Sequence, residues 1–254
     1  MSVGLHMVTN GGNPEGLFRA AFMESGSPIP VGDITHGQGY YDFLVNQTGC
    51  ANSSDTLQCL REVPYDTLMQ AINETPNIMT YQVSKPVESA YKSDFDMQSL
   101  ALAWLPRVDG VFLTADPQDL VMQGSVANIP FVTGDCDDEG TLFSLSTLNI
   151  TSVYSLDVIV MLICLQILST DDQLQEWIQT YFLPSAPVAT IQQVMVDYPQ
   201  DPTQGSPYDT GVLNDLSPQF KRIASFQGDL IFQAPRRFFL QQRSGSQNTW
   251  AFRE

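Results

Sequence analysis

Two short apolar runs constrain the fold of this chain more than any other feature. The first lies in LFRAAFMESGSPIP, residues 17–30, and the second is IPFVTGD, residues 129–135. Apolar runs of this length, bounded by turn residues, are typical of strands buried in a parallel sheet. Segments with helical patterns separate them, as a crossover between parallel strands requires. We therefore expect an α/β layer with a parallel sheet.

Helical patterns fill much of the remaining chain. We expect helices over 2–8, 40–45, 55–61, 64–71 and 173–182, and a long helical stretch over 217–243. Ser217 would cap the long stretch, while Gly228 and Pro235 are potential breaks. The longest apolar run, residues 158–168, is too short for a helix that spans a bilayer. We therefore expect no transmembrane segment.

The composition bounds the class of protein. With 254 residues, of which 43% are hydrophobic, the chain is long enough for one large domain or two small ones with a sizeable core. The formal net charge of -17 would repel both a nucleic-acid backbone and an anionic membrane surface. We expect no nucleic-acid partner, but the charge alone names no substrate.

The four cysteines do not have the spacing of a zinc site, because none stands in a C-x-x-C pair. Cys50 and Cys59 flank a polar, turn-rich connector that would let them close a small loop. Such a disulfide would stabilise the fold by roughly 3 kcal/mol. Two separate thiols are the alternative. We expect Cys136 and Cys164 to stay outside any disulfide, and we expect no metal.

Four N-glycosylation acceptor patterns of the type N-x-S/T occur in the chain. They begin at Asn46, Asn52, Asn73 and Asn149. Together with a short-loop disulfide, they favour an oxidising, secretory compartment over the cytosol. The opening residues MSVGLHMVTNGG lack the basic start and the apolar stretch of a signal peptide. We expect any export signal to lie outside these residues.

The second apolar run leads directly into GDCDDEGTLF, residues 134–143, which is rich in acidic residues. An EF-hand calcium loop would use Asp135, Asp137 and Glu139 as early ligands, but its twelfth position is Ser146 instead of the closing carboxylate. A solvated turn that caps the next helix is a second interpretation. The functional interpretation is a carboxylate at the carboxyl end of a parallel strand, where it could orient a histidine.

Five long blocks of the sequence carry a family resemblance. They are GLFRAAFMESGSP (16–28), LPRVDG (105–110), GDCDDEGTLFSLSTLNIT (134–151), YPQDPTQGSPYDTG (198–211) and SPQFKRIASFQGDLIF (217–232). In this order they resemble the type B carboxylesterase/lipase family, most closely its secreted fungal lipases of the Candida rugosa type. The resemblance implies a partial α/β-hydrolase fold in which helices flank an incomplete, mostly parallel sheet. Residues 1–254 would then form a single incomplete domain.

The resemblance also assigns roles to individual residues. Glu139 matches the acid of the family's Ser-Glu-His triad, which orients the histidine and stabilises its protonated form. Asp137 and Asp138 would stay ionised at the rim of the site without a catalytic role. An apolar acyl-binding tunnel is implied, with ordinary core positions as the alternative, for Ser99, Leu100, Leu102 and Phe143. Cys50 and Cys59 match the family's short-loop disulfide, and no cofactor is implied.

The other two members of the triad match nothing in the chain. The family's serine lies in a G-E-S-A-G elbow that would precede the first residue, and its histidine lies in a block that would follow the last. No G-x-S-x-G occurs, and we expect His6 to be a packed residue of the first helix and His36 a loop residue. A substitute triad of Ser25, His36 and Glu139 is rejected. We expect the chain alone not to hydrolyse esters at the rates of the family, because nucleophile and base act as a unit.

Two segments depart from the family. Residues 153–169 form an apolar insert, VYSLDVIVMLICLQILS, where family members continue almost directly. Translated intron sequence is one hypothesis for this insert, and a surface helix or association patch is the other. The match also lapses over residues 83–98.

The sequence thus predicts part of a secreted carboxylic-ester hydrolase of the carboxylesterase or triacylglycerol lipase type. Its substrate would be an ester or lipid with an apolar acyl chain, and the reaction would pass through an acyl-enzyme without a cofactor. A non-catalytic, cholinesterase-like adhesion protein is the alternative from another class. An unstable product of a truncated gene model is the third interpretation.

Overall fold

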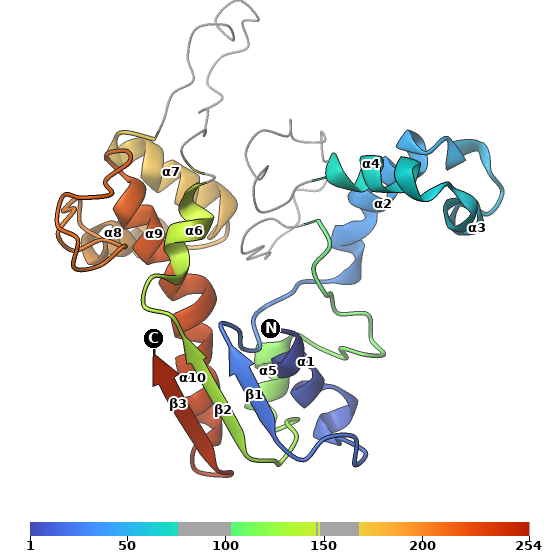
Figure 1. Cartoon of the computed structure of the whole chain (residues 1–254), viewed down its shortest axis with the longest axis horizontal. Coiled ribbons are helices and arrows are strands. Elements are labelled where there is room, and N and C mark those ends of the chain that lie inside the picture. Colours follow the sequence, from blue (N-terminus) through green and yellow to red (C-terminus); the bar gives the residue numbers. More distant parts are fainter. Residues whose placement is uncertain (76–102, 146, 148–167, 254) are drawn as a thin grey trace, which may run out of the picture.

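The computed structural model describes residues 1–75, 103–145, 147 and 168–253 (Figure 1). The strands are β1 (Ala21–Glu24), β2 (Phe131–Asp135) and β3 (Thr249–Arg253). The α-helices are α1 (Ser2–Val8), α2 (Gln38–Gln47), α3 (Thr56–Glu62), α4 (Tyr65–Asn73), α5 (Pro117–Met122), α6 (Glu139–Ser144), α7 (Asp171–Tyr181), α8 (Val188–Asp197), α9 (Phe220–Gly228) and α10 (Ala234–Arg243). Shorter elements are the 3-10 turns η1 (Asn10–Gly12), η2 (Ile34–Gly37) and η3 (Cys50–Asn52), and the π-helical turn η7 (Asp229–Gln233).

The three strands form one parallel sheet in the order β1-β2-β3. In this register Phe131 lies opposite Ala21 on one side and Thr249 on the other. Both apolar runs identified in the sequence therefore contain a strand, and the expected α/β layer with a parallel sheet is confirmed. The sequence patterns did not indicate β3, although its threonine and aromatic residues are typical of strands.

The two faces of the sheet differ in burial. One face packs on residues of α1, α5 and α10, where the ring of Phe131 stacks on Phe239 with their centroids 4.8 Å apart. On the other face Phe22 and Trp250 are each 54% exposed. Burial on both faces, which the apolar runs suggested, is therefore found only for β2. The reason is that the neighbours of a strand, and not its own sequence, decide whether it is covered.

The expected long helix is present, but its start and its interior differ from the expectation. It begins at Phe220, with Gln219 as the N-cap, instead of beginning after Ser217. The chain stays helical through Gly228 and Pro235, and the π-helical turn η7 joins α9 to α10. In a regular α-helix the ring of Pro235 would crowd the carbonyl of Ile231. The wider turn at Asp229–Gln233 includes that carbonyl and lets the helix continue.

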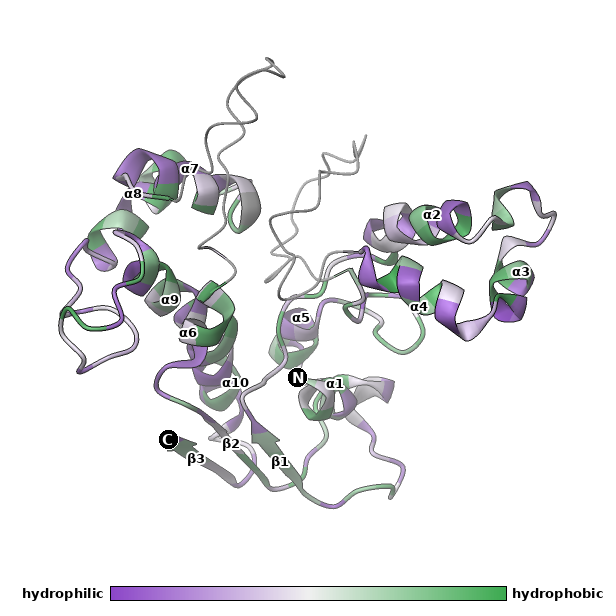
Figure 2. Cartoon of the chain, turned by 45° about the horizontal axis from the view of Figure 1, so that its top comes forward, coloured by the Kyte–Doolittle hydropathy of each residue, from purple (hydrophilic) through white to green (hydrophobic). Residues whose placement is uncertain are grey.

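Residues 38–75 form a helical lobe of α2, α3 and α4 beside the sheet (Figure 1). It has its own apolar core, in which Leu44, Leu60 and Ala71 pack around Cys50. A disulfide joins Cys50 to Cys59, so the expected pairing is confirmed. Figure 2 shows both hydrophobic and hydrophilic residues along α4, as expected of a helix with one buried side.

Most of the shorter helices were also predicted. α1 has the expected bounds, and α2, α3, α4 and α7 agree with the expected ranges to within two residues. Two helices, α5 and α8, were not expected, whereas α6 agrees with the interpretation of the acidic run as a turn that caps the next helix. No helix in the described ranges is long and apolar enough to cross a bilayer. Residues 153–167 of the expected insert lie outside the described residues.

The crossing of α6 and α9 leaves no space for a side chain at Gly140. A Cβ atom there would lie 1.8 Å from the carbonyl oxygen of Ala224 and 2.6 Å from the amide nitrogen of Gly228. We expect Gly140→Ala to lower the free energy of unfolding by about 3 kcal/mol or more, because backbone atoms must move apart.

Urea unfolding of the purified chain measures this effect. Gly39→Ala in α2 is the matched control, since no atom lies within 4 Å of its added Cβ. That variant should be unchanged or more stable by up to about 1 kcal/mol, because alanine favours helix over glycine. Equal unfolding midpoints for Gly140→Ala and the unchanged chain would contradict the tight crossing.

Candidate functional site

Glu139 lies where the central strand meets its following helix. β2 ends at Asp135, and after a turn Glu139 is the first residue of α6. The Glu139 side chain is half-buried. A carboxylate in the first turn of a helix is favoured by the partial positive charge there. The acidic residue singled out from the sequence thus lies at the carboxyl end of the middle strand of a parallel sheet.

One oxygen of Glu139 is held by two donors. Oε1 accepts a hydrogen bond from the hydroxyl of Ser25 and a second from the amide of Cys136, at 2.8 Å. Ser25 directly follows β1, and its own amide donates to the carbonyl of Gly134 at 2.9 Å. Among the described residues no hydrogen bond ends on Oε2. The carboxylate is therefore fixed on one side and open to a further donor on the other.

A buried ion pair stabilises the turn between β2 and α6. Asp135, whose side chain is 0% exposed, accepts from Nε of Arg236 on α10 at 2.6 Å. Burial raises the pKa of Asp135, and the hydrogen bond from Arg236 opposes this effect. Gln233 accepts from the same guanidinium at 2.6 Å and donates to the carbonyl of Cys136 at 3.1 Å. Sequence reasoning missed Arg236 and Gln233, because no local pattern relates α10 to the turn.

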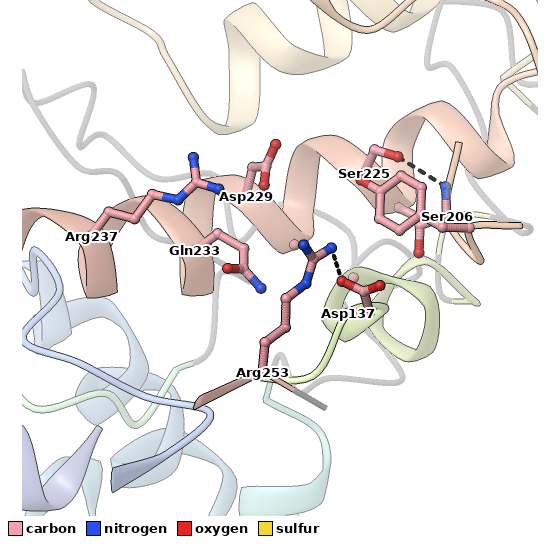
Figure 3. A pocket seen from close by; sticks show the side chains of 11 residues that line it. Asp137, Ser206, Ser225, Asp229, Gln233, Arg237 and Arg253 are labelled. Atoms are coloured by element: carbon pink, nitrogen blue, oxygen red, sulfur yellow. Dashed lines mark hydrogen bonds and ion pairs between the residues drawn. The ribbon is translucent and has the colours of Figure 1, made fainter. Parts of the chain in front are cut away.

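The other two aspartates of the turn have partners of their own. Asp138 Oδ1 accepts from the hydroxyl of Ser206 at 2.9 Å and from the amide of Tyr208 at 2.8 Å. Asp137 forms an ion pair with Arg253 at the end of β3 (Figure 3). The expectation that neither aspartate has a catalytic role stays a prediction, and the contacts show that Asp138 anchors a distant loop. The carboxylates have separate partners, and the described residues contain no group that could hold a metal ion.

A cavity of about 210 Å³ lies next to this turn (Figure 3). Its walls come from α6, from the loop at Ser206 and Tyr208, and from the helix around Asp229 and Gln233. Arg237 and Arg253 also line it. This cavity is polar and does not have the walls of an acyl-binding tunnel.

The apolar residues expected to contact an acyl chain are only partly described. Phe143 on α6 is half-buried and stacks on Phe232, with ring centroids 5.4 Å apart and an interplanar angle of 26°. No sequence pattern distinguishes Phe232 as a contact of Phe143. The other three expected positions, Ser99, Leu100 and Leu102, lie outside the described residues.

Comparisons with known proteins agree with this arrangement. Residues 1–253 match the model of the family described as "Carboxylesterase family". The chain belongs to the carboxylesterase family. Lipase 4 of Diutina rugosa is 39% identical over 96% of the chain, and Secreted lipase 1 of Botryotinia fuckeliana (strain B05.10) is 38% identical over 88%. These alignments cover 39% and 33% of the two relatives, so the chain spans less than half of their length.

A solved structure shows the same fold. EstA of Aspergillus niger superposes with a TM-score of 0.66 over 99% of the chain and 40% of its own, at 21% sequence identity. A likeness at this identity supports the fold and not the activity. The expected partial α/β-hydrolase architecture of this carboxylesterase-family chain is thus confirmed.

Of the two histidines of this carboxylesterase-family chain, only His6 differs from the expectation. His6 is exposed on α1, where Nδ1 lies 2.9 Å from the carbonyl oxygen of Ser2 and the ring meets the edge of Phe112 at 5.5 Å. The expectation of a packed histidine there is wrong, because position 6 faces outward on this short helix. His36 lies in the 3-10 turn η2. Ser25 donates its hydroxyl proton to Glu139, so it serves the acid and not a base.

The adjacent residues Asp137 and Asp138 offer a matched test of the turn. Asp138→Ala should lower the free energy of unfolding by about 1.5–3 kcal/mol, because two hydrogen bonds to an ionised acceptor are lost. Asp137→Ala should cost less than about 1 kcal/mol, since its ion pair is exposed to solvent. Urea unfolding of both variants gives the comparison. An unchanged free energy of unfolding for Asp138→Ala would show that Asp138 does not anchor the loop.

Proposed function

We propose that this chain carries the acid of a Ser-Glu-His triad in a carboxylic-ester hydrolase, and that Glu139 is this acid. The single observation that carries the proposal is the position of Glu139 after the central parallel strand, with Oε1 held and Oε2 outside every hydrogen bond of the described residues. A histidine that donates to Oε2 would meet a carboxylate that cannot rotate away. Open α/β sheets place their reactive groups at this end of the strands.

In this proposal Glu139 acts through electrostatics and orientation. The carboxylate selects the tautomer of the histidine and stabilises the imidazolium that forms as a serine loses its proton. The serine attacks the ester carbonyl, an acyl-enzyme forms, and water releases the acid without a cofactor. The sequence contains no G-x-S-x-G, so the nucleophile of this reaction comes from polypeptide outside these 254 residues. The chain by itself is then inactive.

The substrate class in this proposal is an ester or lipid with an apolar acyl chain. The stacked rings of Phe143 and Phe232 would form part of the wall that contacts this chain, together with Ser99, Leu100 and Leu102. Each methylene buried against such a wall contributes about 0.8 kcal/mol to binding. The names of the matched relatives, which are lipases, support this choice.

The exposed face of the sheet supports a single domain that is incomplete within these residues. Phe22 on β1 and Trp250 on β3 are large apolar side chains, and the described residues leave each of them about half exposed. Apolar faces of this kind are normally covered by another layer. This carboxylesterase-family chain spans less than half of the length of its relatives. Polypeptide outside these residues would then form the missing layer.

We also assign the intact protein to the secretory pathway. The disulfide between Cys50 and Cys59 is typical of an oxidising compartment. Asn46, Asn52 and Asn73 are all exposed, as acceptors of N-linked glycans must be. The name of Secreted lipase 1 agrees with this assignment.

A chimaeric enzyme tests the role of Glu139. Residues 1–253 would replace the matching part of Lipase 4 of Diutina rugosa, which supplies the flanking sequence. We expect the chimaera to hydrolyse a chromogenic ester, and we expect Glu139→Gln to lower kcat by a factor on the order of 10⁴, because the histidine loses its anionic partner. Asp137→Asn is the control and should retain activity within a few-fold.

The purified chain without flanking sequence is assayed beside the chimaera. It should give no turnover above the buffer rate. Turnover by this chain that survives Glu139→Ala would disprove the proposed role, as would full activity of the Glu139→Gln chimaera. Far-ultraviolet circular dichroism of each protein separates loss of catalysis from loss of folding.

A second substitution in the chimaera tests the acyl-chain contact. Phe143→Ala should lower kcat/KM for long-chain esters about tenfold more than for acetate esters, since burial of a phenylalanine contributes about 1.5–3 kcal/mol. Leu142→Ala is the control, because its side chain is 60% exposed on the same helix. Equal losses for long and short esters would assign Phe143 to the core instead of the substrate wall.

A further inference from the structure

Three N-glycosylation acceptor patterns lie on the helical lobe, and the structure distinguishes among them. They begin at Asn46, Asn52 and Asn73, and each asparagine is exposed. The fourth pattern, at Asn149, lies outside the described residues. Exposure of the asparagine therefore does not separate the three sites on the lobe, and the geometry of the whole acceptor pattern has to be compared.

The backbone conformation of the middle residue decides whether the asparagine and the hydroxyl residue of a pattern can reach one enzyme site together. The acceptor pattern needs the asparagine amide and the hydroxyl two residues later. In an extended backbone these two side chains point to the same side, because the side-chain period is two. In a helix they diverge by roughly 200°, since successive residues rotate by about 100°. A single enzyme site cannot receive both groups from a helical pattern.

The pattern at Asn46 is helical and its groups are already bonded. Asn46 lies in the last turn of α2, and its Nδ2 donates to the carbonyl of Asp42 at 2.9 Å. The Thr48 hydroxyl donates to the carbonyl of Leu44 at 2.7 Å. Both groups are therefore held by the helix and point in different directions.

The pattern at Asn73 is divided between surface and interior. Asn73 is the last residue of α4, and Glu74 keeps a helical backbone with φ -83° and ψ -9°. The hydroxyl residue of this pattern, Thr75, is only 3% exposed. Its hydroxyl donates to the carbonyl of Ile72 at 2.6 Å and accepts from Nε1 of Trp104 at 3.0 Å. The folded lobe thus buries the hydroxyl residue of this pattern and leaves only its asparagine exposed.

The pattern at Asn52 differs from the other two in the backbone of its middle residue and in the exposure of its hydroxyl residue. Asn52 ends the 3-10 turn η3, and Ser53 has an extended backbone with φ -75° and ψ 141°. Asn52 and Ser54 are both exposed. Within the described residues neither the Asn52 amide nor the Ser54 hydroxyl takes part in a side-chain hydrogen bond. The backbone between the two groups is therefore not helical, and both groups are available.

We propose that Asn52 is the N-glycan acceptor of the folded lobe, and that Asn46 and Asn73 accept glycans only before the lobe folds. The donor is a lipid-linked oligosaccharyl diphosphate. Nδ2 of Asn52 forms a bond to the anomeric carbon of the sugar while the bond from that carbon to the diphosphate oxygen breaks. The lipid diphosphate leaves with the electron pair, and the amide nitrogen loses one proton.

Glycosylation of the full chain in vitro tests this assignment. Unglycosylated chain with the Cys50–Cys59 disulfide intact is incubated with a purified oligosaccharyltransferase and the lipid-linked donor, and each site is quantified by peptide mass spectrometry. We expect Asn52 to be modified at least about tenfold more than Asn46 or Asn73, because those two sites require local opening of a helix. In the reduced, denatured chain the sites should be modified to a similar extent.

Two variants control the result. Ser54→Ala removes the hydroxyl of the pattern and should abolish modification at Asn52, whereas Ser53→Ala keeps the pattern and should not. Cys59→Ser opens the disulfide and should raise modification at Asn46 and Asn73. Equal modification of the three sites in the chain with its disulfide, or modification of Asn46 ahead of Asn52, would overturn the proposal.

Discussion

A buried ion pair between Asp135 and Arg236 holds the end of the central strand against α10, and the geometry of the site depends on it. The Asp135 side chain is fully buried and that of Arg236 is 10% exposed. Removing either partner would leave an uncompensated charge inside the fold, which typically costs about 3–5 kcal/mol. The same guanidinium binds Gln233, and Gln233 binds the carbonyl of Cys136. The first residue of the turn is thus fixed before the chain reaches Glu139.

The turn resolves the problem of placing four acidic residues close together. Each carboxylate has its own donors, which come from different parts of the chain: Arg236 for Asp135, Arg253 for Asp137, Ser206 and the amide of Tyr208 for Asp138, and Ser25 and the amide of Cys136 for Glu139. Hydrogen bonds and opposite charges offset the mutual repulsion. Within the described residues Asp135 is bonded only through Oδ2, and Asp138 only through Oδ1, so each, like Glu139, keeps one oxygen outside these bonds. Glu139 differs from them in its position, because it is the first residue of α6.

How far the sequence predicts the structure depends on whether the signal is local. The strand at Phe131–Asp135 follows from its own apolar run, and α1 follows from its own pattern, so both were predicted. The start of the long helix was wrong, because a Ser-Pro pair signals a cap without showing that the helix begins at Phe220. The stack of Phe143 on Phe232 was not predictable from spacing, because the two residues meet only where α6 crosses the helix. The disulfide lies between these cases: the spacing allowed it, and the family resemblance selected it.

The sequence by itself determined the α/β class, the parallel strands and the presence of an acid at the end of the second strand. These features depend on local patterns of apolar, turn and acidic residues, and such patterns are visible in the order of the residues alone. Tertiary structure alone decided which groups hold that acid, which face of the sheet is bare and which acceptor pattern presents both of its groups. Ser25, Arg236 and Thr75 acquire their roles through contacts with residues far away in sequence or through burial. Such contacts arise only when the chain has folded, because they depend on the distances between elements and not on the order of the residues.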